Sequence, residues 1–108
     1  MDQAALVTSI GNTLTQLDTE LMSADLTSQP AKWQQVFALR KHLDDQQRSL
    51  VQQSIQADDV SFQALANTIQ AETNALNLEI KDITKIDSVI QIVAQISSGL
   101  DQALKLVS

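Results

Sequence analysis

The sequence has no cysteine and is poor in the residues that turn a chain, with one proline and two glycines in 108 residues. The absence of cysteine excludes disulfide bonds, thiolate nucleophiles and cysteine-ligated metals. So few turn residues disfavour a β-sandwich or β-barrel, which connects many short strands. Gly11 and Gly99 are too few and too far apart for a phosphate-binding glycine loop. We therefore expect a single all-α domain over residues 1–108.

Aromatic residues and positive charge are also scarce. The only aromatic residues are Trp33, Phe37 and Phe62, so aliphatic side chains must form most of the core. Thirteen acidic residues against seven Lys and Arg give a formal net charge of −6 at pH 7. The basic residues are spread along the chain and form no stripe that neutralises several phosphates. Nucleic-acid binding and binding to anionic membranes are both disfavoured.

The sequence contains no apolar run long enough to cross a bilayer. The most apolar stretch, residues 89–100, is interrupted by two glutamines and two serines: Gln91, Gln95, Ser97 and Ser98. The acid at Asp2, directly after Met1, replaces the basic segment with which a cleavable signal peptide begins. These features predict a cytoplasmic protein, and secretion without a cleavable signal remains open.

Apolar residues at helical spacing predict two helices in the first half of the chain, from about residue 2 to 25 and from about 30 to 56. Thr27 or Ser28 is expected to cap the second helix. Pro30 suits its first turn, where a backbone N–H is not needed.

Asp58 or Asp59 is expected to cap a third helix. Because the turn before it is only two or three residues long, we expect the second and third helices to be antiparallel neighbours. Large apolar residues then keep a 3–4 spacing almost to the end of the chain. These residues are Phe62, Leu65, Ile69, Leu76, Ile83, Ile86, Ile90, Val93, Leu100, Leu104 and Val107.

This long stripe decides between two bundles. No glycine or proline interrupts it before Gly99, so we expect one helix from about 60 to 107, continuous or kinked near 81–87. The result is an antiparallel bundle of three long helices. The alternative is a break, with helices of about 60–82 and 84–107 closing a four-helix up-and-down bundle.

The apolar face near the carboxyl terminus covers about half of the helix circumference, which is wider than one neighbouring helix buries. Such a face favours an interface with a protein partner or a second copy of the chain, and we expect a homo-oligomer. In the alternative bundle the same face is buried within a monomer. The predicted interface residues are Val89, Ile92, Val93, Ile96, Leu100 and Leu104.

Polar residues interrupt the apolar stripes at heptad spacing. Arg40 and Gln47 lie on the face of the second helix, and Glu72 and Glu79 lie on the face of the third. We expect a polar core layer with an ion pair between Arg40 and Glu79 or Glu72. Such a layer rejects slipped alignments of the helices and contributes little net stability.

The sequence offers little to catalysis. The one histidine, His42, lies on the polar side of its helix, and no Glu-x-x-His pair is present for a di-iron site. Glu72 and Glu79 lie about 10 Å apart along one helix, with no cleft implied between them. We therefore predict no catalytic residue, metal site or cofactor.

The functional prediction is a non-enzymatic protein–protein interaction module that uses the apolar face near the carboxyl terminus. Trp33 is a possible additional partner contact, although a core position at the end of the bundle explains it too. A secreted membrane-active helical protein is an alternative, as is an acidic immunity or inhibitor protein with a cationic partner.

Overall fold

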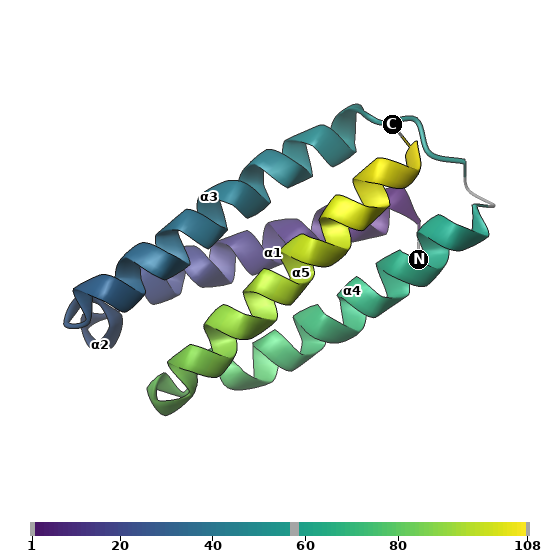
Figure 1. Ribbon diagram of the computed structural model, residues 1–108. Coiled ribbons are helices and arrows are strands. Elements are labelled where there is room, and N and C mark those ends of the chain that lie inside the picture. The colour runs from purple at the N-terminus through teal and green to yellow at the C-terminus, as the bar shows by residue number, and fades with distance from the viewer. Residues whose placement is uncertain (1, 57–58, 108) are drawn as a thin grey trace.

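The computed structural model describes residues 2–56 and 59–107, without the side chains of residues 83 and 107. These described residues form helices and no strand, so the predicted all-α class is confirmed. In chain order, the elements are α1 (Gln3–Leu21), α2 (Ala24–Thr27), α3 (Pro30–Gln52), α4 (Val60–Glu79), the 3-10 helix η1 (Ile83–Lys85) and α5 (Ile86–Val107) (Figure 1).

The first helix ends earlier than predicted, and a separate one-turn helix follows it. α1 stops at Leu21, and the Ser23 hydroxyl caps α2 by accepting a hydrogen bond from the backbone. α3 begins at Pro30 as predicted, but no side chain caps it. The predicted cap at Thr27 or Ser28 is wrong, because Thr27 is the last residue of α2 and Ser28 is its C-cap.

The helix predicted from about 60 to 107 is interrupted, so the prediction of a continuous or merely kinked helix is wrong. α4 ends at Glu79 and α5 begins at Ile86, with η1 between them. Asp82 Oδ1 accepts hydrogen bonds from the Thr84 N–H at 3.0 Å and from the Thr84 hydroxyl at 2.6 Å. This local cap supports the turn, and none of the described residues has a positive φ.

The start of α4 agrees with the sequence. Asp59 is its N-cap and accepts a hydrogen bond from the Phe62 N–H at 2.9 Å, which confirms one of the two predicted caps. The other candidate, Asp58, lies outside the described residues.

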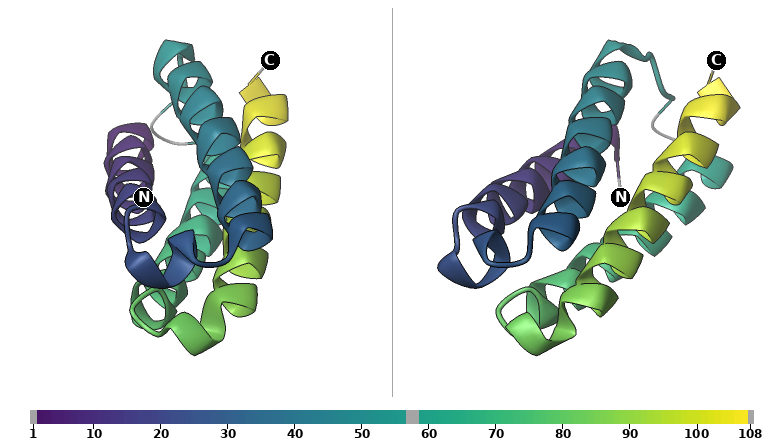
Figure 2. Two further views of the ribbon diagram at one scale, coloured as in Figure 1. Left: turned by 90° about the vertical axis from the view of Figure 1, so that its left-hand side faces the viewer. Right: turned by 60° about the vertical axis from the view of Figure 1, so that its left-hand side comes forward.

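The long helices form two hairpins that lie side by side. α1 packs on α3, with α2 in the turn, and α4 packs on α5, with η1 in the turn. Both turns lie at one end of the molecule, whereas α1 begins and α5 ends at the other (Figures 1 and 2). The hairpins meet where α3 contacts α5 and where α1 contacts α4, and the resulting bundle measures 45 × 22 × 17 Å.

The second and third long helices are not neighbours, contrary to the prediction. α3 packs mainly on α1 and α5, whereas α4 packs mainly on α5 and α1, so α3 and α4 stand diagonally opposite (Figure 2). The physical reason is the length of the connection. α3 stops at Gln52 instead of residue 56, which leaves residues 53–59 to cross the end of the bundle.

One apolar core runs through the bundle and takes side chains from each described α-helix. Its buried members are aliphatic apart from Phe62, as the scarcity of aromatic residues predicts. They are Leu6, Ile10, Leu14, Leu17, Leu21, Leu26, Val36, Leu43, Leu50, Phe62, Ala66, Ile69, Leu76, Ile80, Ile86, Val89, Val93, Ile96, Leu100 and Ala103.

Candidate functional site

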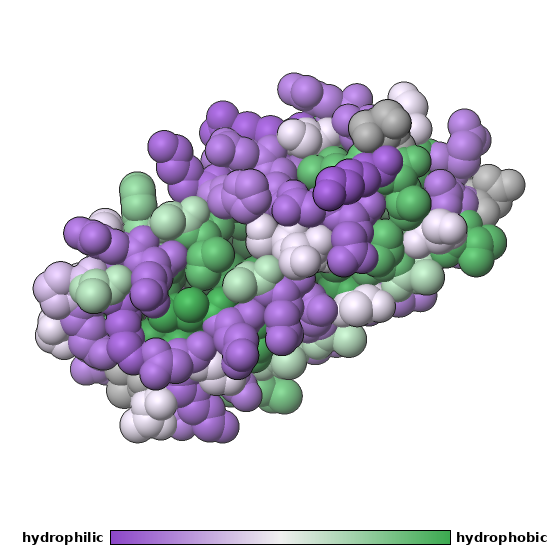
Figure 3. Space-filling view, in the orientation of Figure 1, coloured by the Kyte–Doolittle hydropathy of each residue, from purple (hydrophilic) through white to green (hydrophobic). Residues whose placement is uncertain are grey.

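The predicted interface on α5 faces the chain's own core. Ile92 and Leu104 are half-buried against that core, and the other four predicted residues are buried: Val89, Val93, Ile96 and Leu100. The outer face is mainly hydrophilic, and apolar side chains show mostly along the line where α3 meets α5 (Figure 3). The four buried residues are therefore accessible to a partner only if the hairpins separate.

Arg40 pairs with α1 and not with α4, so the predicted ion pair with Glu79 or Glu72 is wrong. Its Nε lies 2.8 Å from Asp18 Oδ1 and its Nη2 lies 3.2 Å from Asp18 Oδ2. Asp44 adds a longer contact, 3.7 Å from Arg40 Nη1. The reason is the diagonal placement of α3 and α4, which leaves α1 beside this face of α3.

Gln47 lies on the same face of α3 as Arg40 and also contacts α1. Its Nε2 donates to the Val7 carbonyl at 3.0 Å. A Cβ at Gly11 would lie 3.2 Å from this Nε2, so the glycine leaves room for the amide. The predicted heptad relation between Arg40 and Gln47 is thus present, but the polar contacts join α3 to α1.

The two glutamates of the predicted layer lie on α4 and have different surroundings. Glu79 Oε2 accepts a hydrogen bond from the Ser88 hydroxyl of α5. Glu72 Oε2 is buried and has no hydrogen-bond partner. Burial raises the pKa of the Glu72 carboxyl above its ordinary value.

A buried polar pair that the sequence analysis did not single out joins α3 to α5. Gln46 and Ser97 are only 4% and 6% exposed. The Ser97 hydroxyl donates to Gln46 Oε1 at 2.9 Å, and Gln46 Nε2 donates to the Ser97 carbonyl at 2.9 Å and to Asp101 Oδ1 at 2.7 Å. The available signal was positional, because Ser97 stands directly after the buried Ile96 on the apolar side of α5.

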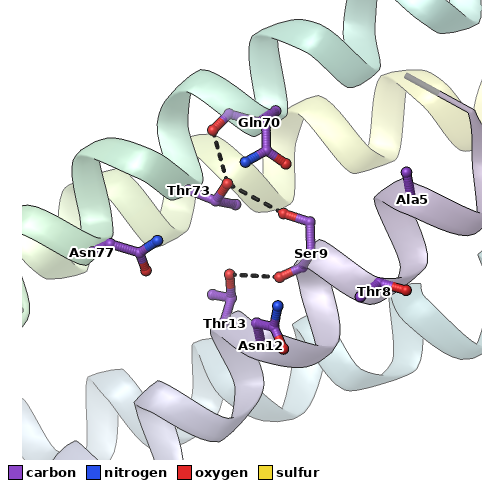
Figure 4. A pocket seen from close by; sticks show the side chains of 8 residues that line it. All are labelled: Ala5, Thr8, Ser9, Asn12, Thr13, Gln70, Thr73 and Asn77. Carbon is purple, nitrogen blue, oxygen red and sulfur yellow. Dashed lines mark hydrogen bonds between the residues drawn. The ribbon is translucent and has the colours of Figure 1, made fainter.

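Small polar side chains line a hollow of about 220 Å³ between α1 and α4 (Figure 4). The Ser9 and Thr73 hydroxyls lie 3.2 Å apart across it, and the Thr13 hydroxyl donates to the Ser9 carbonyl at 3.1 Å. The lining residues are Ala5, Thr8, Ser9, Asn12, Thr13, Gln70, Thr73 and Asn77. None of these groups titrates near neutral pH, so they offer neither a general base nor a charged metal ligand.

An aromatic patch lies at the end of the bundle that contains α2. The Trp33 and Phe37 rings stack with centroids 5.2 Å apart and planes 8° apart. The Trp33 indole N–H donates to the Leu21 carbonyl at 2.8 Å, which ties this ring to the end of α1. Phe37 is 46% exposed, and a hollow of about 290 Å³ adjoins Trp33. We call Trp33, Phe37 and this hollow the aromatic patch.

Other functional groups are sparse on the described surface. Within residues 2–56 and 59–107, no three His, Cys, Asp or Glu side chains lie close enough together to hold a metal ion. His42 is exposed on α3. The described helices include none with the length and apolar character needed to cross a membrane.

No protein-family model matches this chain, and comparison with curated proteins and with solved structures gives no match.

Proposed function

We propose that this chain is a non-enzymatic protein-interaction module and that its partner contacts the aromatic patch. The observation that carries this proposal is the exposure of Phe37, which remains 46% accessible although it stacks on Trp33. Aromatic side chains are enriched at protein interfaces because they bury a large area with little loss of side-chain entropy. The hollow beside Trp33 gives an incoming side chain a place to insert.

The interaction site on this proposal differs from the one predicted from the sequence. The apolar face of α5 supplies Val93, Ile96 and Leu100 to the intramolecular core. We propose that the working form is a closed bundle of four long helices, in which this face stays buried. A partner then binds the outer surface, so it does not have to open the core first.

The charge of the chain favours a basic partner. A net charge of −6 attracts cationic proteins over a long range and speeds their association at low ionic strength. This preference fits an acidic inhibitor or immunity protein better than a membrane-active protein, because anionic lipid repels an acidic surface. A second copy of the chain carries the same negative charge and is the less favoured partner.

A pair of single substitutions tests the role of the patch. Phe37→Glu places a charge in the aromatic patch, and Ala38→Glu places the same charge on the adjacent exposed residue of α3. Wild type and both variants serve as bait for cell extracts, followed by quantitative mass spectrometry. We expect a partner that is retained by wild type and by Ala38→Glu and is lost with Phe37→Glu.

Two controls accompany this experiment. Circular dichroism confirms that both variants remain helical, and light scattering over a range of concentrations shows whether the partner is a second copy. Equal recovery of every bound protein by both variants would refute the aromatic patch as the interface.

A further inference from the structure

A second hollow, of about 220 Å³, lies between α4 and α5 and contains the unpaired carboxylate of Glu72. Leu65 and Ile69 form its apolar wall on α4. Gln95, Ser98 and Gln102 border it from α5. The hollow thus combines one buried acceptor atom, a short apolar wall and several neutral polar side chains.

The close approach of the two helices shapes this site. Gly99 lies at the wall of the hollow, and a Cβ there would lie only 3.0 Å from Ile69 Cγ1. Because Gly99 has no side chain, the backbone of α5 can pack against Ile69 at this level. The packing fixes Glu72 and the α5 side chains around one shared space.

No positive charge compensates the Glu72 carboxylate within the hollow. None of the other lining residues carries a charge. Glu72 Oε2 is out of contact with solvent and accepts no hydrogen bond. A buried acceptor without a donor is unfavourable, so a ligand that brings donors and a positive charge improves this arrangement.

We propose that this hollow binds an alkylammonium group, with Glu72 as its counter-ion. An ammonium group carries three donors, which matches one buried carboxylate oxygen surrounded by the side-chain oxygens of Gln95, Ser98 and Gln102. The methylenes next to the ammonium contact Leu65 and Ile69. A guanidinium suits the site less well, because its planar fork favours both oxygens of one carboxylate. The site is separate from the aromatic patch and does not depend on the proposed function.

The test is an NMR titration of the full chain with n-butylammonium, and n-butanol serves as the uncharged control of similar length. We expect saturable chemical-shift changes at Glu72, Gln95 and Ser98 with the amine and not with the alcohol. Glu72→Gln should weaken binding at least about tenfold, since it removes the charge and keeps the shape. Asp45→Asn removes one negative charge from an exposed position on α3 and should leave binding unchanged.

Each outcome is decisive for the pocket. Changes that do not saturate, that persist in Glu72→Gln or that occur equally with n-butanol would overturn the proposal. A second titration with N-acetyl-lysine amide distinguishes the two sources of such a ligand. Tighter binding of this compound assigns the pocket to a lysine of a partner protein, and tighter binding of n-butylammonium assigns it to a free amine.

Discussion

The two hairpins of this bundle are held together by different kinds of contact. In the α1–α3 hairpin, polar side chains reach across to backbone carbonyls at several levels, from the start of α1 to its end. The hydrogen bonds run from Gln3 to Leu50 at 2.7 Å, from Gln47 to Val7 at 3.0 Å and from Trp33 to Leu21 at 2.8 Å. The ion pair between Arg40 and Asp18 adds a further level.

In the α4–α5 hairpin, close packing takes the place of these contacts. Gly99 brings the backbone of α5 against Ile69 of α4, and the apolar residues on both sides of this contact are buried. The hydrogen bond between Ser88 and Glu79 lies near the turn. The comparison teaches that one chain uses directional polar contacts for one hairpin and size complementarity for the other. The two hairpins should therefore respond differently to the same kind of substitution.

The largest effect is expected from a change of size in the α4–α5 hairpin. Gly99→Val should lower the free energy of unfolding by about 2–3 kcal/mol, because its side chain has no space beside Ile69. Urea denaturation followed by circular dichroism measures this change. Ala94→Val introduces the same side chain at an exposed position of α5 and should cost only about 0.5 kcal/mol. Similar losses in both variants would show that Gly99 is not a point of close packing.

A smaller effect is expected when a polar contact of the α1–α3 hairpin is removed without a change of size. Gln47→Met keeps the length of the side chain but cannot donate to the Val7 carbonyl, and it should lower the free energy of unfolding by about 1 kcal/mol. Gln35→Met makes the same change at an exposed position of α3. If both variants unfold at the same urea concentration as wild type, the hydrogen bond does not stabilise this hairpin.

The apolar spacing of the sequence predicted much of this core. Positions such as Leu14, Val36 and Val93 belong to 3–4 stripes, and each is buried. The cap at Asp59 was also evident, because acidic side chains satisfy free N–H groups at a helix start. These features depend on local sequence alone.

The arrangement of the helices could not be predicted in the same way. The break between α4 and α5 rests on a short Asp82–Thr84 cap, which competes with an apolar stripe that continues in phase across it. The partner of Arg40 depends on which helix lies beside α3, and this follows from the diagonal crossing of residues 53–59. Glu72 was recognisable as a polar residue in an apolar stripe, but its missing partner is a property of the packed bundle.

The smallest effects should show that one chemical change has opposite signs in the two hairpins. Asp18→Asn removes the carboxylate that pairs with Arg40, and this half-exposed ion pair should be worth about 0.5 kcal/mol at pH 7. Glu72→Gln removes a carboxylate that has no partner at Oε2, so it should raise the free energy of unfolding slightly at pH 7. Urea denaturation of both variants against wild type measures the two differences.

The pH dependence of Glu72→Gln sharpens this test. Burial raises the pKa of Glu72 in the folded chain above its ordinary value of 4.5. Folding is therefore opposed at pH values above the folded pKa, where the carboxyl is charged in both states. Below 4.5 the carboxyl is protonated in both states and the penalty vanishes. The advantage of Glu72→Gln over wild type should accordingly be present at pH 7 and disappear as the pH falls below 4.5. An advantage that stays constant across this range would show that the glutamine acts through packing and that the unpaired charge does not weaken the α4–α5 hairpin.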